Sequence, residues 1–261
     1  MISPEMVMIV GPALAAGLMI GLTHAPLGIV VLRRGIIFID LAIAQIAGLG
    51  VVAAGLFWGE PPWWAVQGSA LSSAVAAALF FHLVERFLPE RQEAFIGCSF
   101  VVAASLAVLL LTGQPHGDEA IEQLFSGQLL FVTWAQVALH APVYGIILAL
   151  WFLRPQTRQG VWFYLLFSAA ITSSVQLTGV FVVFASLIAP ALGAAGHSGA
   201  RQELATAYGV TLIALLSGFG FAIQFDLPLG PLLVCSFMLS AILIALWRQL
   251  RHRSGNSAGL G

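Results

Sequence analysis

The sequence contains no lysine, and only 8% of its 261 residues are charged. A soluble chain of this length needs far more polar surface to cover its core. The missing lysine also excludes a P-loop, so this chain carries no nucleotide-binding motif of that kind. The net charge of −1 gives no basic surface for nucleic acid. These shortages exclude a soluble domain and a nucleic-acid binder.

Cysteine is also scarce, and no enzyme signature is present. The two cysteines, Cys98 and Cys235, lie inside apolar runs, so we expect small buried side chains rather than a disulfide or a metal pair. The sequence has no HExxH or GxSxG motif and no paired carboxylates on one predicted helix. We therefore expect a protein that is not an enzyme and that binds no cofactor.

Long apolar runs fill most of the sequence. Sixty per cent of the residues are hydrophobic, and the mean hydropathy is +0.99. Apolar runs of roughly 17–25 residues are long enough to span the hydrocarbon layer as helices. The pattern predicts an all-α, polytopic membrane bundle with nine spans. The expected spans are residues 5–23, 36–57, 64–84, 94–113, 137–153, 161–176, 179–195, 205–224 and 231–247.

Arginine predicts the orientation of these spans. With nine alternating spans, every arginine falls on the side of the C-terminus, and the opposite connections carry acidic residues and no arginine. By the positive-inside rule the C-terminus is cytoplasmic and the N-terminus outside. The arginines are residues 33, 34, 86, 91, 154, 158, 201, 248, 251 and 253.

The tryptophans and the two ends of the chain complete the predicted layout. All seven tryptophans lie at predicted helix ends, as an interfacial aromatic belt requires. The first apolar run lacks a basic segment and a cleavage site, so we expect it to be a retained span. Residues 1–254 form one predicted membrane domain, and residues 255–261 read as a flexible tail.

Four segments, in order along the chain, carry a family resemblance. They are Pro26 to Arg34 (PLGIVVLRR), Leu124 to Thr133 (LFSGQLLFVT), Gly179 to Pro190 (GVFVVFASLIAP) and Gly218 to Pro231 (GFGFAIQFDLPLGP). Over roughly residues 24–240 the chain resembles the permease subunits of ABC importers for zinc, manganese or iron(II). Within that family, the first segment resembles the first cytoplasmic loop.

The resemblance implies a set of partners and a location. The chain would act as a homodimer among membrane lipids, in the inner membrane of a bacterium. Cytoplasmic ABC ATPase subunits would drive it, and an extracytoplasmic metal-binding protein would deliver a divalent metal ion as cargo. A permease holds such an ion only briefly at polar stops along the pathway.

The second span departs from the family pattern, which has Asp-x-x-x-His there. Counting forward from Arg34, Asp40 falls on the aspartate, but counting back from Gly50, Gln45 falls on the histidine. Positions i and i+5 lie about 140° apart on a regular helix, so these side chains would not converge. We hypothesise a π-bulge between Asp40 and Gln45 that returns both to the ion pathway as transient ligands. A structural role for Asp40, beside a helix terminus or a cytoplasmic arginine, stays open.

A second departure lies between the fifth and sixth spans. The family has a sizeable cytoplasmic loop there that docks on the ATPase, but this chain has only residues 154–160. Either another surface, such as residues 85–93 or 196–204, provides the docking, or the coupling differs from that of the family.

An expected outer loop gathers further ligand types. His116, Asp118 and Glu119 could receive the ion or contact the binding protein. A solvated polar loop without any ligand is the simpler interpretation. For His82 and His140, inside spans, we expect hydrogen-bonded core side chains, and His24 is assigned no role.

Two other functions remain open from the sequence. The glutamine at position 45 leaves room for an ABC permease whose cargo is a chelated metal or a cofactor. The short connection at residues 154–160 favours an ATP-independent secondary transporter or channel.

Overall fold

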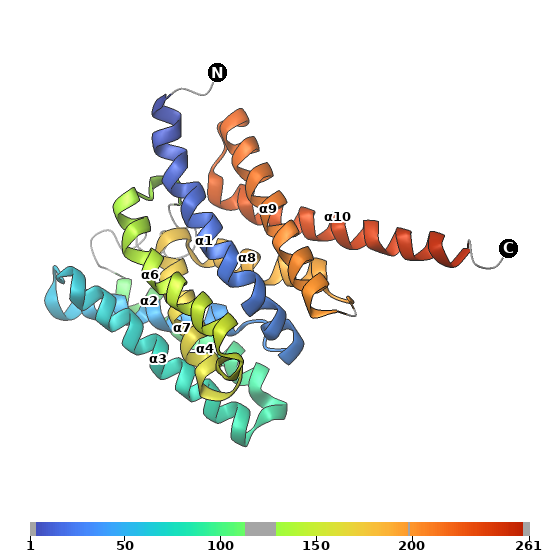
Figure 1. Ribbon diagram of the computed structural model, residues 1–261. Helices are drawn as coiled ribbons and strands as arrows, with labels where there is room; N and C mark the ends of the chain where they lie inside the picture. Colours follow the sequence, from blue (N-terminus) through green and yellow to red (C-terminus); the bar gives the residue numbers. More distant parts are fainter. Residues whose placement is uncertain (1–3, 113–128, 198, 258–261) are drawn as a thin grey trace.

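The computed structural model describes residues 4–112, 129–197 and 199–257, and within those ranges the fold is entirely helical. Over those described ranges, nine α-helices and three short 3-10 helices form one bundle (Figure 1). The α-helices are α1 (Pro4–Arg34), α2 (Ile39–Trp58), α3 (Trp63–Phe87), α4 (Gln92–Leu111), α6 (Trp134–Leu153), α7 (Gly160–Thr178), α8 (Val180–Ala194), α9 (Ala200–Phe225) and α10 (Leu229–Ser257). The 3-10 helices are η1 (Pro89–Arg91), η2 (Leu129–Phe131) and η3 (Pro155–Arg158). All nine predicted helices are present, so the predicted all-α fold is confirmed.

Eight of these helices are long and apolar enough to cross a membrane, and α8 is the exception. Its 15 residues extend only about 22 Å at 1.5 Å per residue, less than the roughly 30 Å of hydrocarbon. A single residue, Gly179, separates α7 from α8, as predicted. It has φ +77°, a left-handed backbone conformation that glycine adopts without a steric penalty.

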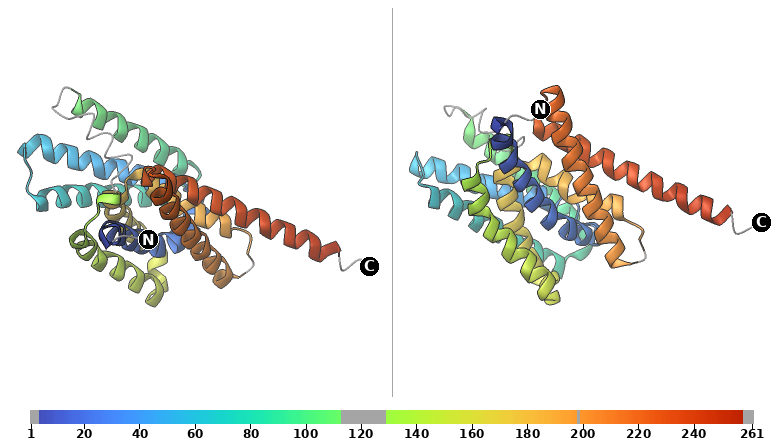
Figure 2. Two further views of the ribbon diagram at one scale, coloured as in Figure 1. Left: turned by 90° about the horizontal axis from the view of Figure 1, so that it is seen from above. Right: turned by 45° about the horizontal axis from the view of Figure 1, so that its top comes forward.

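The bundle divides into two groups of helices joined by a central set. α2, α3 and α4 lie on one side, α9 and α10 on the other, and α1, α7 and α8 lie between them (Figures 1 and 2). The later part of α10 extends away from the other helices in every view (Figure 2). α8 packs against α1, α9 and α10, and almost all of its side chains are buried. A short helix in the middle of the bundle thus joins the two halves.

Close approach of α1 and α8 depends on one glycine. A Cβ added at Gly28 would lie 2.0 Å from the Leu187 carbonyl oxygen, which is far inside van der Waals contact. Small residues that let two backbones approach are typical of helix contacts in membranes, where packing replaces the hydrophobic driving force.

The charged side chains gather at one end of the bundle. Arg34 bridges to Glu85 at 3.0 Å and donates to the Arg158 carbonyl oxygen at 3.1 Å, which joins the ends of α1, α3 and η3. Arg33 pairs with Glu203 on α9, and Arg248 donates to the Ala195 carbonyl oxygen at 3.0 Å. These contacts place the arginines of α1, η3 and α10 at one end, which agrees with the predicted sorting. We call this the arginine end.

Three sequence predictions are wrong in detail. Residues 26–34 were expected to form a loop, but α1 continues through Pro26 to Arg34. The π-bulge is absent, because α2 is a regular α-helix from Ile39 onward. Cys98 and Cys235 are free, as expected, but they are exposed rather than buried. In a membrane protein an apolar position can face lipid as readily as the core, so apolar surroundings did not imply burial.

Gly28→Ala tests the packing of α1 on α8. The new methyl group must push the two backbones apart, and overpacking of this kind costs about 1–3 kcal/mol. We expect a lower midpoint of thermal unfolding in detergent. Gly145→Ala on α6 is the matched control, since nothing lies within 4 Å of its added Cβ. Equal midpoints for the two variants would contradict this description of the contact.

Candidate functional site

Asp40 lies in the first turn of α2 and is completely buried. Among the described residues neither carboxylate oxygen has a hydrogen-bond partner of good geometry, although the backbone N–H groups of Asp40 and Leu41 lie close by. The N-terminus of a helix carries a partial positive charge, which stabilises an anion there. An acidic side chain in a membrane bundle without a paired cation is costly, and it commonly marks a path for substrate.

A second acid approaches the same helix terminus from α4. A Glu93 carboxylate oxygen accepts a hydrogen bond from the Phe38 backbone N–H at 3.4 Å, directly before α2 begins. Its other oxygen is buried without a partner. Asp40 and Glu93 are close enough to interact electrostatically. Two carboxylates therefore share the start of α2, and neither forms an ion pair among the described residues.

The regular geometry of α2 decides which residue follows Asp40 on its face. Position i+4 lies nearly above position i, and here it is Ala44. Ala44, Ala47 and Gly48 line a pocket of about 530 Å³ in the bundle. Asp40 is thus one turn from the pocket on the same stripe. Gln45 follows Ala44 and lies about 100° round the helix from it. Its side chain is buried and is not among the residues that line the pocket. The structure does not bring Asp40 and Gln45 together.

The pocket lies between α2, α3, η2, α6 and α7, toward the helix ends opposite the arginine end. Its walls combine aliphatic side chains with amide, imidazole and hydroxyl groups. The polar members are Gln67, Gln136, His140, Thr172 and Gln176. None of them carries a carboxylate. Pockets of this size, mostly apolar with a few polar groups, are typical of small-molecule sites.

Two of these polar side chains differ in whether they have a hydrogen-bond partner in the described part of the chain. His140 forms a 2.7 Å hydrogen bond with the Ser173 hydroxyl, as expected for a histidine within a span. Thr172 is 5% exposed, and its hydroxyl has no partner in the described part of the chain. An unpartnered hydroxyl that lines a pocket is available to a ligand.

The sequence reasoning missed a buried histidine. His24 bonds to the Ser186 hydroxyl at 2.8 Å through Nδ1 and to the Ser174 hydroxyl at 3.0 Å through Nε2. Tyr144 adds a 2.9 Å contact to Ser174. Both serines also donate to carbonyl oxygens of their own helices, at Ala170 and Val183. His24 was assigned no role because the predicted first span ends at residue 23, which places His24 at the membrane edge, whereas α1 continues to Arg34.

This network ties α1 to both sides of the Gly179 break, because Ser174 lies on α7 and Ser186 on α8. A neutral imidazole has one donor and one acceptor nitrogen. One serine must therefore give its proton to the ring rather than to its backbone carbonyl. The position of the proton on His24 thus decides which helix keeps its serine–backbone bond.

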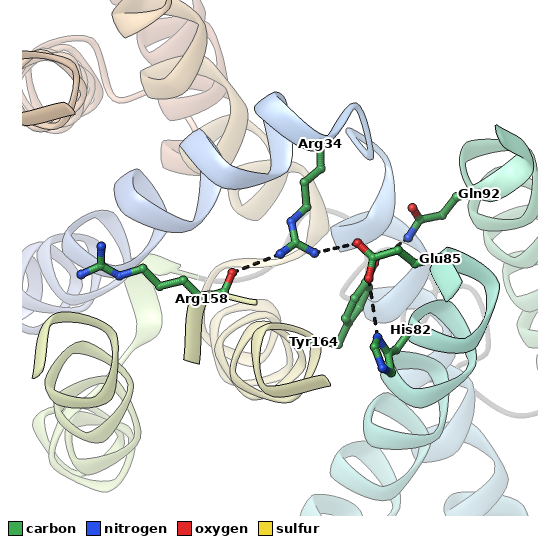
Figure 3. Close-up of polar contacts among 6 residues, drawn as sticks. All are labelled: Arg34, His82, Glu85, Gln92, Arg158 and Tyr164. Carbon is green, nitrogen blue, oxygen red and sulfur yellow. Dashed lines mark hydrogen bonds and ion pairs between the residues drawn. The ribbon is translucent and has the colours of Figure 1, made fainter. Parts of the chain in front are cut away.

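A second polar cluster lies at the arginine end (Figure 3). Arg34 contacts Glu85, and Glu85 in turn lies 3.5 Å from Nδ1 of His82. Gln92 at the start of α4 donates to the Tyr164 hydroxyl on α7 at 2.6 Å. The Arg34 guanidinium also lies 4.3 Å from the centre of the Phe163 ring, a cation–π contact. These side chains fasten α3 and α4 to α1 and α7.

The remaining predicted site residues are not placed. His116, Asp118 and Glu119 lie outside the described residues. Across the described ranges, no group of three or more His, Cys, Asp or Glu side chains is arranged to hold a metal ion.

Eight of the helices in the described part of the chain are long and apolar enough to cross a membrane, which indicates a multi-pass membrane protein, and a buried acid such as Asp40 often marks a transport path in such proteins. The sequence matches the ABC 3 transport family over residues 6–159 and 153–249. The chain belongs to that family. A comparison with curated protein sequences finds no match.

Two solved structures share the fold. PsaBC from Streptococcus pneumoniae in complex with Fab aligns with a TM-score of 0.71 at 14% identity, covering 93% of this chain and 95% of the other. An inward-facing conformation of a metal-chelate type ABC transporter aligns with a TM-score of 0.66 at 15% identity, covering 94% and 89%. The two matched segments overlap at residues 153–159.

His24→Ala tests the network at the break. The change removes two hydrogen bonds and leaves a cavity, so we expect a stability loss of roughly 2 kcal/mol or more. Thermal unfolding in detergent measures it. Ser217→Ala is the control, because that half-buried hydroxyl donates to carbonyl oxygens of its own helix, α9. A midpoint for His24→Ala equal to the control's would show that the network adds nothing to stability.

Proposed function

We propose that the chain is the membrane-spanning subunit of an ABC importer for a divalent metal ion, in the inner membrane of a bacterium. The family match supports a transport permease. In this proposal ATP hydrolysis belongs to separate subunits. In this proposal two copies form the pathway, and an extracytoplasmic binding protein delivers zinc, manganese or iron(II).

One observation carries the proposal. Asp40, buried and without a hydrogen-bond partner, lies one helical turn below the pocket on the same face of α2. A carboxylate is a ligand type for each of these cations. A single carboxylate beside a neutral pocket binds weakly, which suits a transient stop from which the ion can leave.

The pocket favours a second candidate cargo, a chelated metal ion. Its volume of about 530 Å³ is large for a bare ion, and its polar groups are neutral. Ala44 occupies the i+4 position, where an imidazole would complete a two-ligand site with Asp40. Amides, a hydroxyl and an imidazole instead suit the oxygen-rich surface of a chelated metal.

Asp40→Ala tests the role of the acid. We expect metal uptake to fall to the background of cells that lack the protein, because the only described carboxylate on the pocket stripe is removed. Metal accumulation in whole cells measures uptake, and gel filtration in detergent checks that the protein remains folded. Glu60→Ala, an exposed acid between α2 and α3, is the control. Normal uptake by a folded Asp40→Ala variant would remove this residue from the pathway.

Thr172→Val separates the two cargoes. The substitution keeps the side-chain volume but removes the unpartnered hydroxyl. For a chelated metal, uptake of the metal as its citrate complex should fall about tenfold, since one lost hydrogen bond of about 1.4 kcal/mol corresponds to that factor. For a bare ion, uptake of the free metal should be unchanged. Thr112→Val, an exposed threonine at the end of α4, is the control.

Dependence on ATP tests the class of transporter. Uptake into proteoliposomes that contain the purified complex should require enclosed ATP. Uptake by the permease alone, without any ATPase, would instead favour a secondary transporter or channel.

A further inference from the structure

Acids from two different helices lie at one helix terminus, the start of α2. The Asp40 carboxylate lies beside the backbone N–H groups of Asp40 and Leu41. The Glu93 carboxylate reaches the same terminus from α4, which packs against α2, and accepts from the Phe38 backbone N–H at 3.4 Å. The two carboxylates therefore face neighbouring amide groups of a single turn.

The described arginines nearest in the chain do not neutralise these acids. Arg34, at the end of α1, bridges to Glu85 at 3.0 Å (Figure 3), and Arg33 pairs with an acid on α9. Among the described residues, neither Asp40 nor Glu93 forms an ion pair. Carboxylates inside a membrane bundle are costly without a countercharge. A cation that enters the bundle, or a proton, can supply it.

Three carboxylate oxygens at this turn are available to a cation. Both oxygens of Asp40 and Oε2 of Glu93 are buried and have no hydrogen-bond partner in the described part of the chain. The whole Asp40 side chain is inaccessible to solvent. A single proton shared between the acids would engage only two of these oxygens. A metal cation can engage all three, so the arrangement favours the cation.

The donors at this turn are all oxygen atoms. The position one turn after Asp40 is Ala44, which offers no donor. The interior histidines His24 and His140 form hydrogen bonds with serine hydroxyls of α7 and α8 instead. Carboxylate oxygen suits hard ions such as manganese, whereas nitrogen and sulfur donors favour zinc. The donor set therefore favours manganese.

The acids lie between the pocket and the arginine end. α1 ends at Arg34 in the arginine end, and α2 begins at Ile39. Asp40 lies one turn before Ala44, which lines the pocket. A cation that moves from the neutral pocket toward the arginine end therefore passes the two carboxylates.

We propose that Asp40 and Glu93 form one oxygen-only cation site between α2 and α4, with Mn²⁺ as its cargo. This inference rests on the proposed function and adds Glu93 as a residue that determines the specificity of the importer. The two carboxylates supply the negative charge, and water completes the coordination of the ion. Because only two side chains hold the ion, it leaves readily toward the arginine end.

Glu93→Gln tests the second ligand, because the amide oxygen can still accept from the Phe38 N–H but the negative charge is lost. Electron paramagnetic resonance of Mn²⁺ added to the purified complex in detergent measures binding. We expect the dissociation constant to rise about tenfold or more, since losing even an indirect partner of a metal costs roughly 10–100-fold in affinity. Asp40→Ala should remove the same binding.

Glu90→Gln, an exposed acid on η1 at the same end, is the matched control and should bind Mn²⁺ as the unmodified chain does. Thermal unfolding confirms that each variant is folded. An unchanged dissociation constant in folded Glu93→Gln would overturn the inference. So would the absence of any Mn²⁺ binding that depends on Asp40, a result that indicates a shared proton instead.

Glu93→His gives an independent readout and tests the choice of metal. The substitution replaces an oxygen donor with a nitrogen donor, so the ratio of zinc to manganese that cells accumulate should rise about tenfold. Glu90→His is the control and should leave the ratio unchanged. An unchanged ratio in Glu93→His, or a preference of the unmodified chain for zinc, would contradict the oxygen-only manganese site.

Failure of the inference and failure of the proposed function give different results. If Asp40→Ala abolishes metal uptake but both Glu93 variants behave as the unmodified chain, the inference is wrong and the importer stands. If the unmodified chain with its ATPase takes up no divalent metal ion, both proposals are wrong.

Discussion

The exclusion of charge from hydrocarbon is the constraint on which this structure depends. Backbone amides in a bilayer must bond within their own segment, so the described residues form helices and short turns. Charged side chains must lie at the ends or find partners inside. Most of the described arginines mark one end, where Arg33, Arg34 and Arg248 join five helices through acids and carbonyl groups. The ion pairs therefore set the relative positions of helices that have few polar contacts elsewhere.

The interior polar groups described here fall into two kinds, those that hydrogen-bond to one another and those that have no hydrogen-bond partner among the described residues. His24, Tyr144 and the two serines satisfy one another and fasten α1 across the Gly179 break. Asp40, Thr172 and one oxygen of Glu93 have no such partners in the described part of the chain. The satisfied groups hold the centre of the bundle together. These three groups lie along the pocket and the start of α2, where a passing cargo can use them, whereas the other unsatisfied atoms, Gln45 Nε2 and His82 Nδ1, lie away from the pocket.

Much of the fold was predictable from the sequence, because a 20-residue apolar run in a membrane has few alternatives to a helix. The nine helices and the Gly179 turn follow from run length and turn residues. Proline was the misleading signal. Pro26 suggested a loop, but a proline within a membrane helix is tolerated where neighbouring groups satisfy the freed carbonyl. Ending the first span at residue 23 put His24 at an edge and concealed the network.

The site was less predictable, since it depends on helix phase rather than on composition. Counting forward from Arg34 and back from Gly50 matched Asp40 and Gln45 to the family's two ligand positions. A π-bulge was needed to bring these two side chains to one face of the helix. In the regular helix, Ala44 follows Asp40 on the pocket face, and Gln45 points elsewhere. Residue spacing along α2 also gives no information about side chains that approach from other helices. Glu93 and Thr172 reach the site from α4 and α7, and nothing in their own segments marks them.

The two acids at the start of α2 connect the pathway to the arginine end. Glu93 is the second residue of α4 and lies just after η1. Its carboxylate accepts a hydrogen bond from the Phe38 backbone N–H, directly before α2. Asp40 lies in the same turn and interacts with the charge of Glu93. Moving Glu93 away weakens the repulsion between the carboxylates and exposes the N–H groups that Glu93 had engaged. A cation at Asp40 would lose some attraction in that state, because one of two nearby negative charges has withdrawn. The electrostatic surroundings of Asp40 therefore depend on the position of α4 as well as on α2 itself.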